Sequence, residues 1–382
     1  MVSLSSRLVA WPSLIGALVC VVLASSVAAA EPRLDPSELS PAAYRQQLND
    51  MVVTIMVGPP QATGLDIAYD LSGVLDDDLS LRIVPVIGKG VAQNVRDVRF
   101  MRGVDLGLTH ANILNHFSRT GELGPNLVSQ ITYVAKLFNE EVHLLARSEI
   151  EGIEDLAGKR VNLGGEGSGS DITAKLLLDA LDIRVQPAYF GTAEAIRQLK
   201  SGELDAAFVI GGKPTPTMSI ISQGDGLKLL AIPYKSQLED DYYPATLTFR
   251  DYPELVAQGD TLETVAVCAV LITFNWTKDS ERYRKVEKFV DAFFSKFEDL
   301  HKAPSHPKWR EVNFAATLEN WNRSPIAQDW IDRSDVPATA QAEFDAFMQE
   351  RMTSSSSQMS ERERAKLFRE FVRWSNDRSP GE

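Results

Sequence analysis

Cysteine and histidine are scarce in this chain of 382 residues, which contains two cysteines and five histidines. Cys20 falls in an N-terminal leader, so Cys268 stands alone in the mature protein and no internal disulfide can form. Cys268 lies in an apolar run, which predicts a buried, unreactive thiol. No Cys-x-x-Cys pair and no His-x-x-x-His pair occurs. Because zinc is commonly held at such spacings, the sequence predicts no metal site.

A net positive charge and known catalytic motifs are also absent from the sequence. The formal net charge is −13, which argues against nucleic acid as a partner because such proteins usually present basic patches. The chain has no Gly-x-Ser-x-Gly nucleophile elbow, and its glycine-rich stretch 164–169 matches neither a P-loop nor a dinucleotide fingerprint. We therefore expect no cofactor, and we do not expect an enzyme.

Only the N-terminus carries an apolar run approaching the length of a membrane span. Arg7 precedes this run, and Ala28-Ala29-Ala30 precedes Glu31, as at a signal-peptidase site. Residues 1–30 are therefore predicted to be a secretory signal peptide. An uncleaved membrane anchor is the alternative, which Pro12 and Ser13 disfavour by interrupting the run.

The rest of the chain alternates between short apolar runs and amphipathic helices, which predicts an α/β fold with a parallel sheet covered on both faces. Strands are expected at 51–57, 81–86, 105–109, 142–147, 160–163, 206–210 and 264–274. In open sheets of this kind, ligands bind beyond the carboxyl ends of the strands. Polar residues at such ends are Thr63, Lys89, Thr109 and Asn112.

These elements fall into two sets, which we expect to form two lobes joined by two crossing hinge strands. Lobe 1 is predicted to comprise residues 50–147 and 264–335, and lobe 2 residues 148–263. A helix is expected from about 276, with 301–337 irregular and 336–382 a C-terminal helical extension. That extension could dock a partner or a membrane surface, but packing on its own protein is favoured.

Gly164 to Asp171 form the most informative stretch, because they follow a predicted strand and open a predicted helix. Unpaired backbone amides in a first helical turn attract small anions, and the serines add hydroxyl donors or caps. Half of a carboxylate site is one interpretation, and an ordinary capped strand–helix turn is the other. Ile172, Leu176 and Ala180 recur at the helical repeat and predict the apolar stripe of that helix.

Several motifs together resemble a known family. They are Ile153 to Val161, Gly167 to Ser170, Phe190 to Ala195, Leu204 to Phe208 and Gly212 to Pro216. In combination they resemble the TAXI family of solute receptors for TRAP transporters, over about residues 50–300. The resemblance implies a type II periplasmic binding protein fold and a periplasmic, monomeric receptor. Such a receptor would deliver a small organic anion or amino acid, such as a dicarboxylate or glutamate, to a TRAP-type membrane permease. A periplasmic sensor acting on a membrane histidine kinase is the alternative.

The resemblance also implies which residues bind the solute, within four segments. They are Gln61, Ala62 and Thr63 in the first loop; Thr109, His110 and Asn112 in the second; Gly167, Ser168, Gly169, Ser170 and Asp171 at the helix start; and Gly212, Lys213 and Pro214 at the far strand end. The family's first loop is nearly all glycine, whereas Pro59 and Pro60 stand here. The identity of the ligand therefore stays open.

Overall fold

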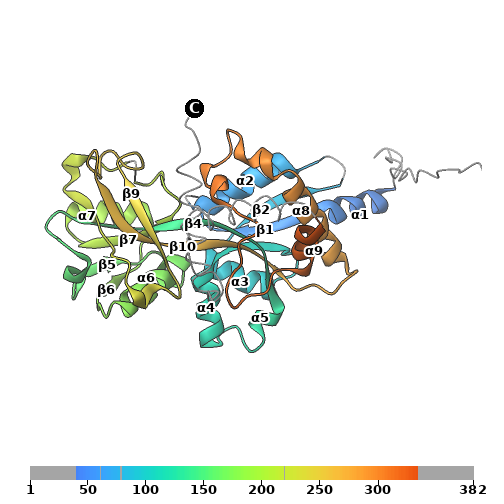
Figure 1. The fold of residues 1–382 in the computed structure, drawn as a ribbon, viewed down its shortest axis with the longest axis horizontal. Helices are drawn as coiled ribbons and strands as arrows, with labels where there is room; N and C mark the ends of the chain where they lie inside the picture. The colour runs from blue at the N-terminus through green and yellow to red at the C-terminus, as the bar shows by residue number, and fades with distance from the viewer. Residues whose placement is uncertain (1–39, 61, 78–79, 219, 334–382) are drawn as a thin grey trace, which may run out of the picture. The chain divides into compact units, whose positions relative to one another are not determined.

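The computed structural model describes residues 40–333, apart from 61, 78–79 and 219 (Figure 1). The chain divides into two compact units, residues 1–46 and 47–382, and helix α1 (Pro41–Met51) spans their boundary. All elements described below belong to the second unit. The predicted signal peptide, Gln61 and the predicted extension 336–382 lie outside the described residues.

A first set of strands and helices runs from residue 52 to residue 130. Strand β1 pairs in parallel with β2 on one side and with β3 on the other. Helices follow each strand, as the alternating sequence pattern predicts. The elements are β1 (Val52–Val57), α2 (Thr63–Leu75), β2 (Arg82–Ile87), α3 (Val91–Phe100), β3 (Leu106–His110), α4 (Ala111–Thr120) and α5 (Leu127–Gln130).

A second set repeats this arrangement between residues 153 and 248. Strand β5 pairs in parallel with β6 and with β7. Its α-helices and strands are β5 (Arg160–Asn162), α6 (Gly169–Ala180), β6 (Gln186–Ala188), α7 (Thr192–Ser201), β7 (Ala206–Gly211), β8 (Leu227–Leu230) and β9 (Tyr243–Thr248). Its 3₁₀ helices are η2 (Ile153–Leu156), η3 (Gln223–Asp225) and η4 (Ser236–Leu238).

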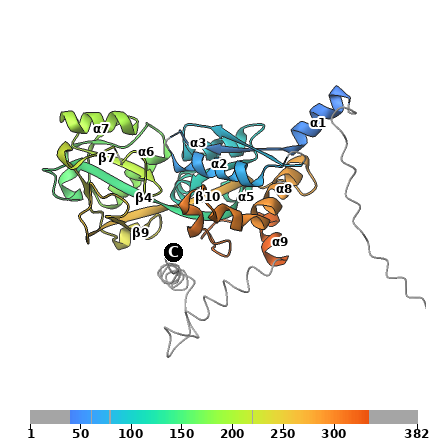
Figure 2. The same ribbon diagram turned by 90° about the horizontal axis from the view of Figure 1, so that it is seen from above.

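Two long antiparallel strands connect the sets, β4 (Ile131–Arg147) and β10 (Thr261–Phe274) (Figure 2). The sheet order is β2-β1-β3-β10-β4-β7-β5-β6. Strand β4 pairs with β10 as far as Glu141 and with β7 from Glu141 onward. Strand β10 pairs with β9 up to Ala266 and with β3 from Ala269. The predicted α/β class and the two crossing strands of a type II periplasmic binding protein are confirmed by this order.

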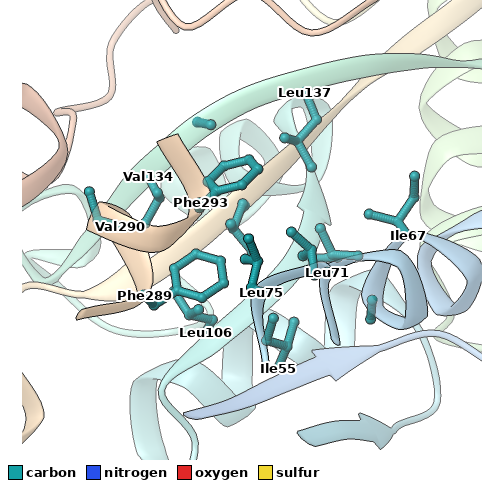
Figure 3. Packing of buried hydrophobic residues seen from close by; sticks show 14 of the residues in the cluster. Ile55, Ile67, Leu71, Leu75, Leu106, Val134, Leu137, Phe289, Val290 and Phe293 are labelled. Carbon is teal, nitrogen blue, oxygen red and sulfur yellow. The ribbon is translucent and has the colours of Figure 1, made fainter. Parts of the chain in front are cut away.

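The apolar cores follow the same division. Two clusters use residues from 53 to 138 and from 268 to 331, and two others use residues from 142 to 267. Figure 3 shows one of the first pair, in which Leu71 and Leu75 of α2 lie near Phe289 and Phe293. These phenylalanines belong to α8 (Glu281–Ser295), whose buried residues are Tyr283, Val286, Phe289, Val290, Phe293 and Phe294.

The structure corrects two sequence-based expectations. The predicted stripe of α6, Ile172, Leu176 and Ala180, is only half-buried, and the residues in the core cluster of its own set are Ala174, Leu177 and Leu178. Ile172 instead packs against a core cluster of the first set, because α6 is covered from two sides. The segment predicted to be irregular contains helices η6 (Pro307–Glu311) and α9 (Pro325–Arg333), and η5 (Phe297–His301) precedes it.

Candidate functional site

The carboxyl ends of strands from both sets meet at one place. Helix α2 begins there at Thr63, α4 at Ala111 and α6 at Gly169. Helix α6 contacts α4 and also α3, beside which it lies in Figure 2. Hydrogen bonds join the sets at this place: the Gly212 amide donates to Thr63 Oγ1 at 2.9 Å, and Asn112 Nδ2 donates to Thr173 Oγ1 at 2.9 Å. The sequence-predicted loops are therefore brought together by the fold.

The starts of α3 and α6 touch directly. Gly169 is so close to α3 that a Cβ built on it would overlap Val91 Cγ2, and the Cβ position of Gly90 lies 4.0 Å from the Gly169 amide nitrogen. Gly90 has φ 132°, a conformation that favours glycine. Each helix start carries a partial positive charge from its unpaired amides. Two like partial charges are thus apposed, and an anion between them would stabilise the arrangement.

Part of the glycine–serine loop is occupied by its own side chains. Ser168 caps α6 by accepting from the Asp171 amide at 3.2 Å. The buried Asp171 carboxylate accepts from the Gly167 amide at 2.9 Å and from Lys175 Nζ at 2.9 Å. The amides of Gly169 and Ser170 lie in the first turn of α6, where backbone amides have no acceptor within their own helix. The amide set available to an anion is therefore smaller than the five residues 167–171 predicted.

A buried acid–base pair lies at the carboxyl end of β3. His110 Nε2 and Glu140 Oε2 are 2.7 Å apart, and their side chains are 5% and 10% exposed. Burial opposes ionisation of Glu140, yet its contacts with His110, Lys308 and Thr63 lower the pKa of its carboxyl below the ordinary value. His110 Nδ1 is buried without a hydrogen-bond partner in the described part of the chain, and so is Asn112 Oδ1. Such atoms carry a desolvation penalty unless a ligand or water pairs with them.

A second buried cluster surrounds Glu141, where β4 changes partners. Lys308 Nζ lies 2.7 Å from Glu141 Oε1 and 2.8 Å from Glu311 Oε1, and the Lys308 side chain is 2% exposed. The Lys213 amide donates to Glu141 Oε2 at 3.0 Å. Burial raises the pKa of Glu141 to about 6 despite the attraction of Lys308. Glu140 and Glu141, which are adjacent on β4, thus both lie close to the end of β7.

Behind this cluster His143 is held neutral. Its side chain is fully buried, Nδ1 lies 3.2 Å from the Val209 carbonyl oxygen, and Nε2 lies 2.7 Å from the Tyr252 hydroxyl. The Thr215 amide in turn donates to that hydroxyl at 2.9 Å. Burial lowers the pKa of His143 to about 4. This histidine therefore supports the end of β7.

The remaining predicted residues are placed as follows. Thr109 is buried, and its hydroxyl donates to the Val91 carbonyl at 3.0 Å. Lys213 turns its ammonium away from the meeting point, toward the Thr246 carbonyl oxygen at 2.6 Å and Asp251 at 3.4 Å. Ala62 immediately precedes α2, and Pro214 follows Lys213 beyond β7.

The sequence prediction missed Glu140, Glu141 and Lys308. Two adjacent acids directly before the apolar run that begins at Val142 were a usable signal for the glutamates, because buried carboxylates need partners. Lys308 gave no such signal, since it lies far along the chain and only the fold brings it to Glu141.

Features outside this meeting point include a surface cavity and a buried thiol. A surface cavity lies on α6 and β6, away from the meeting point, and is lined by Leu163, Lys175, Leu178, Asp179, Asp182, Ile183, Arg184, Val185 and Pro187. Among residues 40–333, leaving out 61, 78–79 and 219, no cluster of three or more His, Cys, Asp or Glu side chains is arranged to hold a metal. No helix among these residues has the length and apolar character to cross a membrane. Cys268 is buried, as predicted, and burial raises the pKa of its thiol to about 11.

Comparison with known proteins gives a family match over most of the chain. The model of the NMT1-like family matches residues 71–323. Among solved structures, the periplasmic binding protein BugD is 16% identical over 77% of this chain and 97% of its own, with a TM-score of 0.44. The alkanesulfonate-binding protein SsuA from Xanthomonas axonopodis pv. citri, bound to MOPS, is 15% identical over 80% and 95%, with a TM-score of 0.41. MatC from Rhodopseudomonas palustris, with bound malate, is 18% identical over 68% and 86%, with a TM-score of 0.40.

Proposed function

Because the chain belongs to the NMT1-like family, we propose that it is an exported solute receptor that binds a small organic anion where its two sets of strands and helices meet. The contact between the starts of α3 and α6 is the observation that carries this proposal. Two partial positive charges are apposed there, and the amides of Gly169 and Ser170 belong to the first turn of α6, which has no acceptors for them within the helix. A carboxylate or another small anion supplies the negative charge that this arrangement lacks.

We further propose that binding closes two lobes, residues 50–147 with 264–335 and residues 148–263. The hinge lies at Glu141 of β4 and between Ala266 and Ala269 of β10, because both strands change partners at these positions. An anion that contacts both lobes binds the closed form better, and this difference in affinity shifts the population toward closure.

The permease is a separate part of the proposal. Motifs between Ile153 and Pro216 resemble those of TAXI receptors, which implies delivery to a TRAP-type permease in the membrane. A TAXI receptor in the periplasm, with a dicarboxylate or an acidic amino acid as its solute, is the most specific form of this hypothesis.

The test combines a ligand screen with a substitution at the helix contact. Dicarboxylates, sulfonates and acidic amino acids are screened for a rise in melting temperature, since a ligand that binds only the folded state stabilises it. For the best anion, we expect Gly169→Ala to raise Kd by roughly tenfold or more, because overpacking against Val91 costs about 1–3 kcal/mol in the closed form.

Matched variants make this result specific. Gly165→Ala lies in the same loop, where an added Cβ meets nothing closer than 4.0 Å, and should leave Kd unchanged. Val91→Ala should restore binding to Gly169→Ala by removing the methyl that the new Cβ overlaps. If no anion stabilises the protein in the screen, the proposed function is wrong. If Gly169→Ala binds the anion with wild-type affinity, the site does not lie at this helix contact.

A further inference from the structure

The buried pair of His110 and Glu140 has a feature that helix packing leaves unexplained. His110 Nε2 is bonded to Glu140, but its Nδ1 is buried with no partner among the described residues. The imidazole sits at the carboxyl end of β3 and immediately precedes α4, whose Asn112 contacts α6 through Thr173. A polar atom is thus left for a ligand at the meeting point of the two sets.

The state of Glu140 determines what the His110 nitrogen facing it must carry. Glu140 is buried and is held in its ionised form by its contacts, so the His110 nitrogen that faces it carries a proton. Lys308, the other cation that lowers the pKa of Glu140, is bonded to Glu141 and Glu311. A buried carboxylate needs a compensating charge close by, and the His110 ring is the group in direct contact with its Oε2, at 2.7 Å.

An imidazolium carries protons on both nitrogens, so Nδ1 is a hydrogen-bond donor. We propose that Glu140 is a positioning residue that keeps His110 charged, and that the buried Nδ1–H of His110 selects a carboxylate over its neutral amide. This inference rests on the proposed function, because it assigns a selectivity to the same site. Glu140 contributes without touching the solute, and His110 makes the contact.

Removing the charge of Glu140 changes what His110 offers. In Glu140→Gln the amide oxygen still accepts from Nε2–H, but no negative charge remains to hold the second proton. His110 then becomes neutral, and Nδ1 presents a lone pair that repels a carboxylate and accepts from an amide N–H. The variant keeps the size of the side chain, so packing at the hinge is retained.

The experiment measures Kd for matched probes, namely succinate with succinamate and glutamate with glutamine. We expect the wild type to prefer the carboxylate by about tenfold or more, since hydrogen bonds between charged groups are roughly twice as strong as neutral ones. Glu140→Gln should abolish or reverse this preference. Glu311→Gln is the matched control, because it removes a neighbouring carboxylate that contacts Lys308 instead of His110.

A second measurement does not depend on the variant folding. In wild-type protein labelled with 15N-histidine, nitrogen chemical shifts report which ring nitrogens are protonated, and His110→Gln assigns the signal. Protons on both nitrogens of His110 support the inference. A bare Nδ1 would overturn it, as would an unchanged carboxylate preference in a folded Glu140→Gln. Failure of every anion to bind wild type would instead remove the proposed function on which the inference rests.

Discussion

Single residues near the point where β4 changes partners have ionisation states set by burial and by their partners. His143 illustrates this, because its ring lies in the core and its two nitrogens are paired with Val209 and Tyr252 as those of a neutral imidazole. Burial also raises the pKa of Glu141, as expected for an acid, because it disfavours the charged carboxylate. Both residues lie on β4 within the stretch that connects the two sets of strands.

His143 predicts a loss of stability in mild acid. Its pKa is about 4 in the folded protein and 6.5 when unperturbed, so the unfolded chain takes up a proton that the folded one refuses. Its contribution is present above pH 6.5 and is lost as the pH falls toward 4, by at most about 3 kcal/mol. The free energy of unfolding in urea, measured from pH 7.5 to 4.5, should therefore fall more steeply in wild type than in His143→Gln.

The control for this comparison is Tyr252→Phe, which removes the hydroxyl but keeps the imidazole. It should lower stability at every pH and retain the steeper slope, since His143 still titrates in the unfolded state. Parallel curves for wild type and His143→Gln would contradict the assignment of a neutral, buried histidine.

Among the elements, helix α6 shows why a loop motif can be identified from sequence while its detailed use cannot. The glycines and serines predicted a helix start at this position, and the structure confirms a cap by Ser168. Side chains of the same loop accept hydrogen bonds from some of the amides that were predicted to bind an anion, because the Asp171 carboxylate accepts from the Gly167 amide. Local sequence predicts that a cap will form, but several polar side chains nearby compete for the role.

Two serine caps in this protein form a matched pair. Ser168 caps α6 at the site, and Ser280 caps α8 away from it, each accepting from the amide three residues on. Changing either serine to alanine should lower the free energy of unfolding by about 1 kcal/mol. Only Ser168→Ala should also weaken binding of the best anion from the screen, because α6 positions the amides of Gly169 and Ser170. If calorimetry shows equal effects of both variants on affinity, the start of α6 is not part of the anion site.

For the molecule as a whole, contacts between the two sets maintain the arrangement seen here. One is an ion pair at the edge of the meeting point, in which Arg119 of α4 binds both oxygens of Asp241, at 3.2 and 2.7 Å. Asn115 donates to the same carboxylate at 3.1 Å. Half-exposed pairs of this kind contribute little individually, but a bidentate geometry is among the stronger ones.

We expect this pair to favour the closed arrangement. Asp241→Arg should raise Kd for the best anion several-fold, by about 1 kcal/mol or less, and should give a larger radius of gyration in X-ray scattering. The exchanged pair Arg119→Asp with Asp241→Arg should recover most of the affinity. Glu154→Gln breaks an exposed pair with Lys235 inside the second set and should change neither quantity. No recovery in the exchanged pair would show that the two charges do not act together.

By itself the sequence determined the α/β class, most strands of the first set and the loops that the fold brings together, because hydrophobic periodicity and glycine punctuation are local properties. It did not predict β6, β8, β9 or the first half of β4. Thr63, at the start of α2, and His110, at the end of β3, were among its candidate ligand residues and remain predictions. Only the tertiary structure decided that Glu140 pairs with His110, that Lys308 reaches Glu141 across 167 residues, and that Lys213 turns away. Such pairings depend on the burial of charges by segments far apart in the chain, and a buried charge takes whichever partner the fold places beside it.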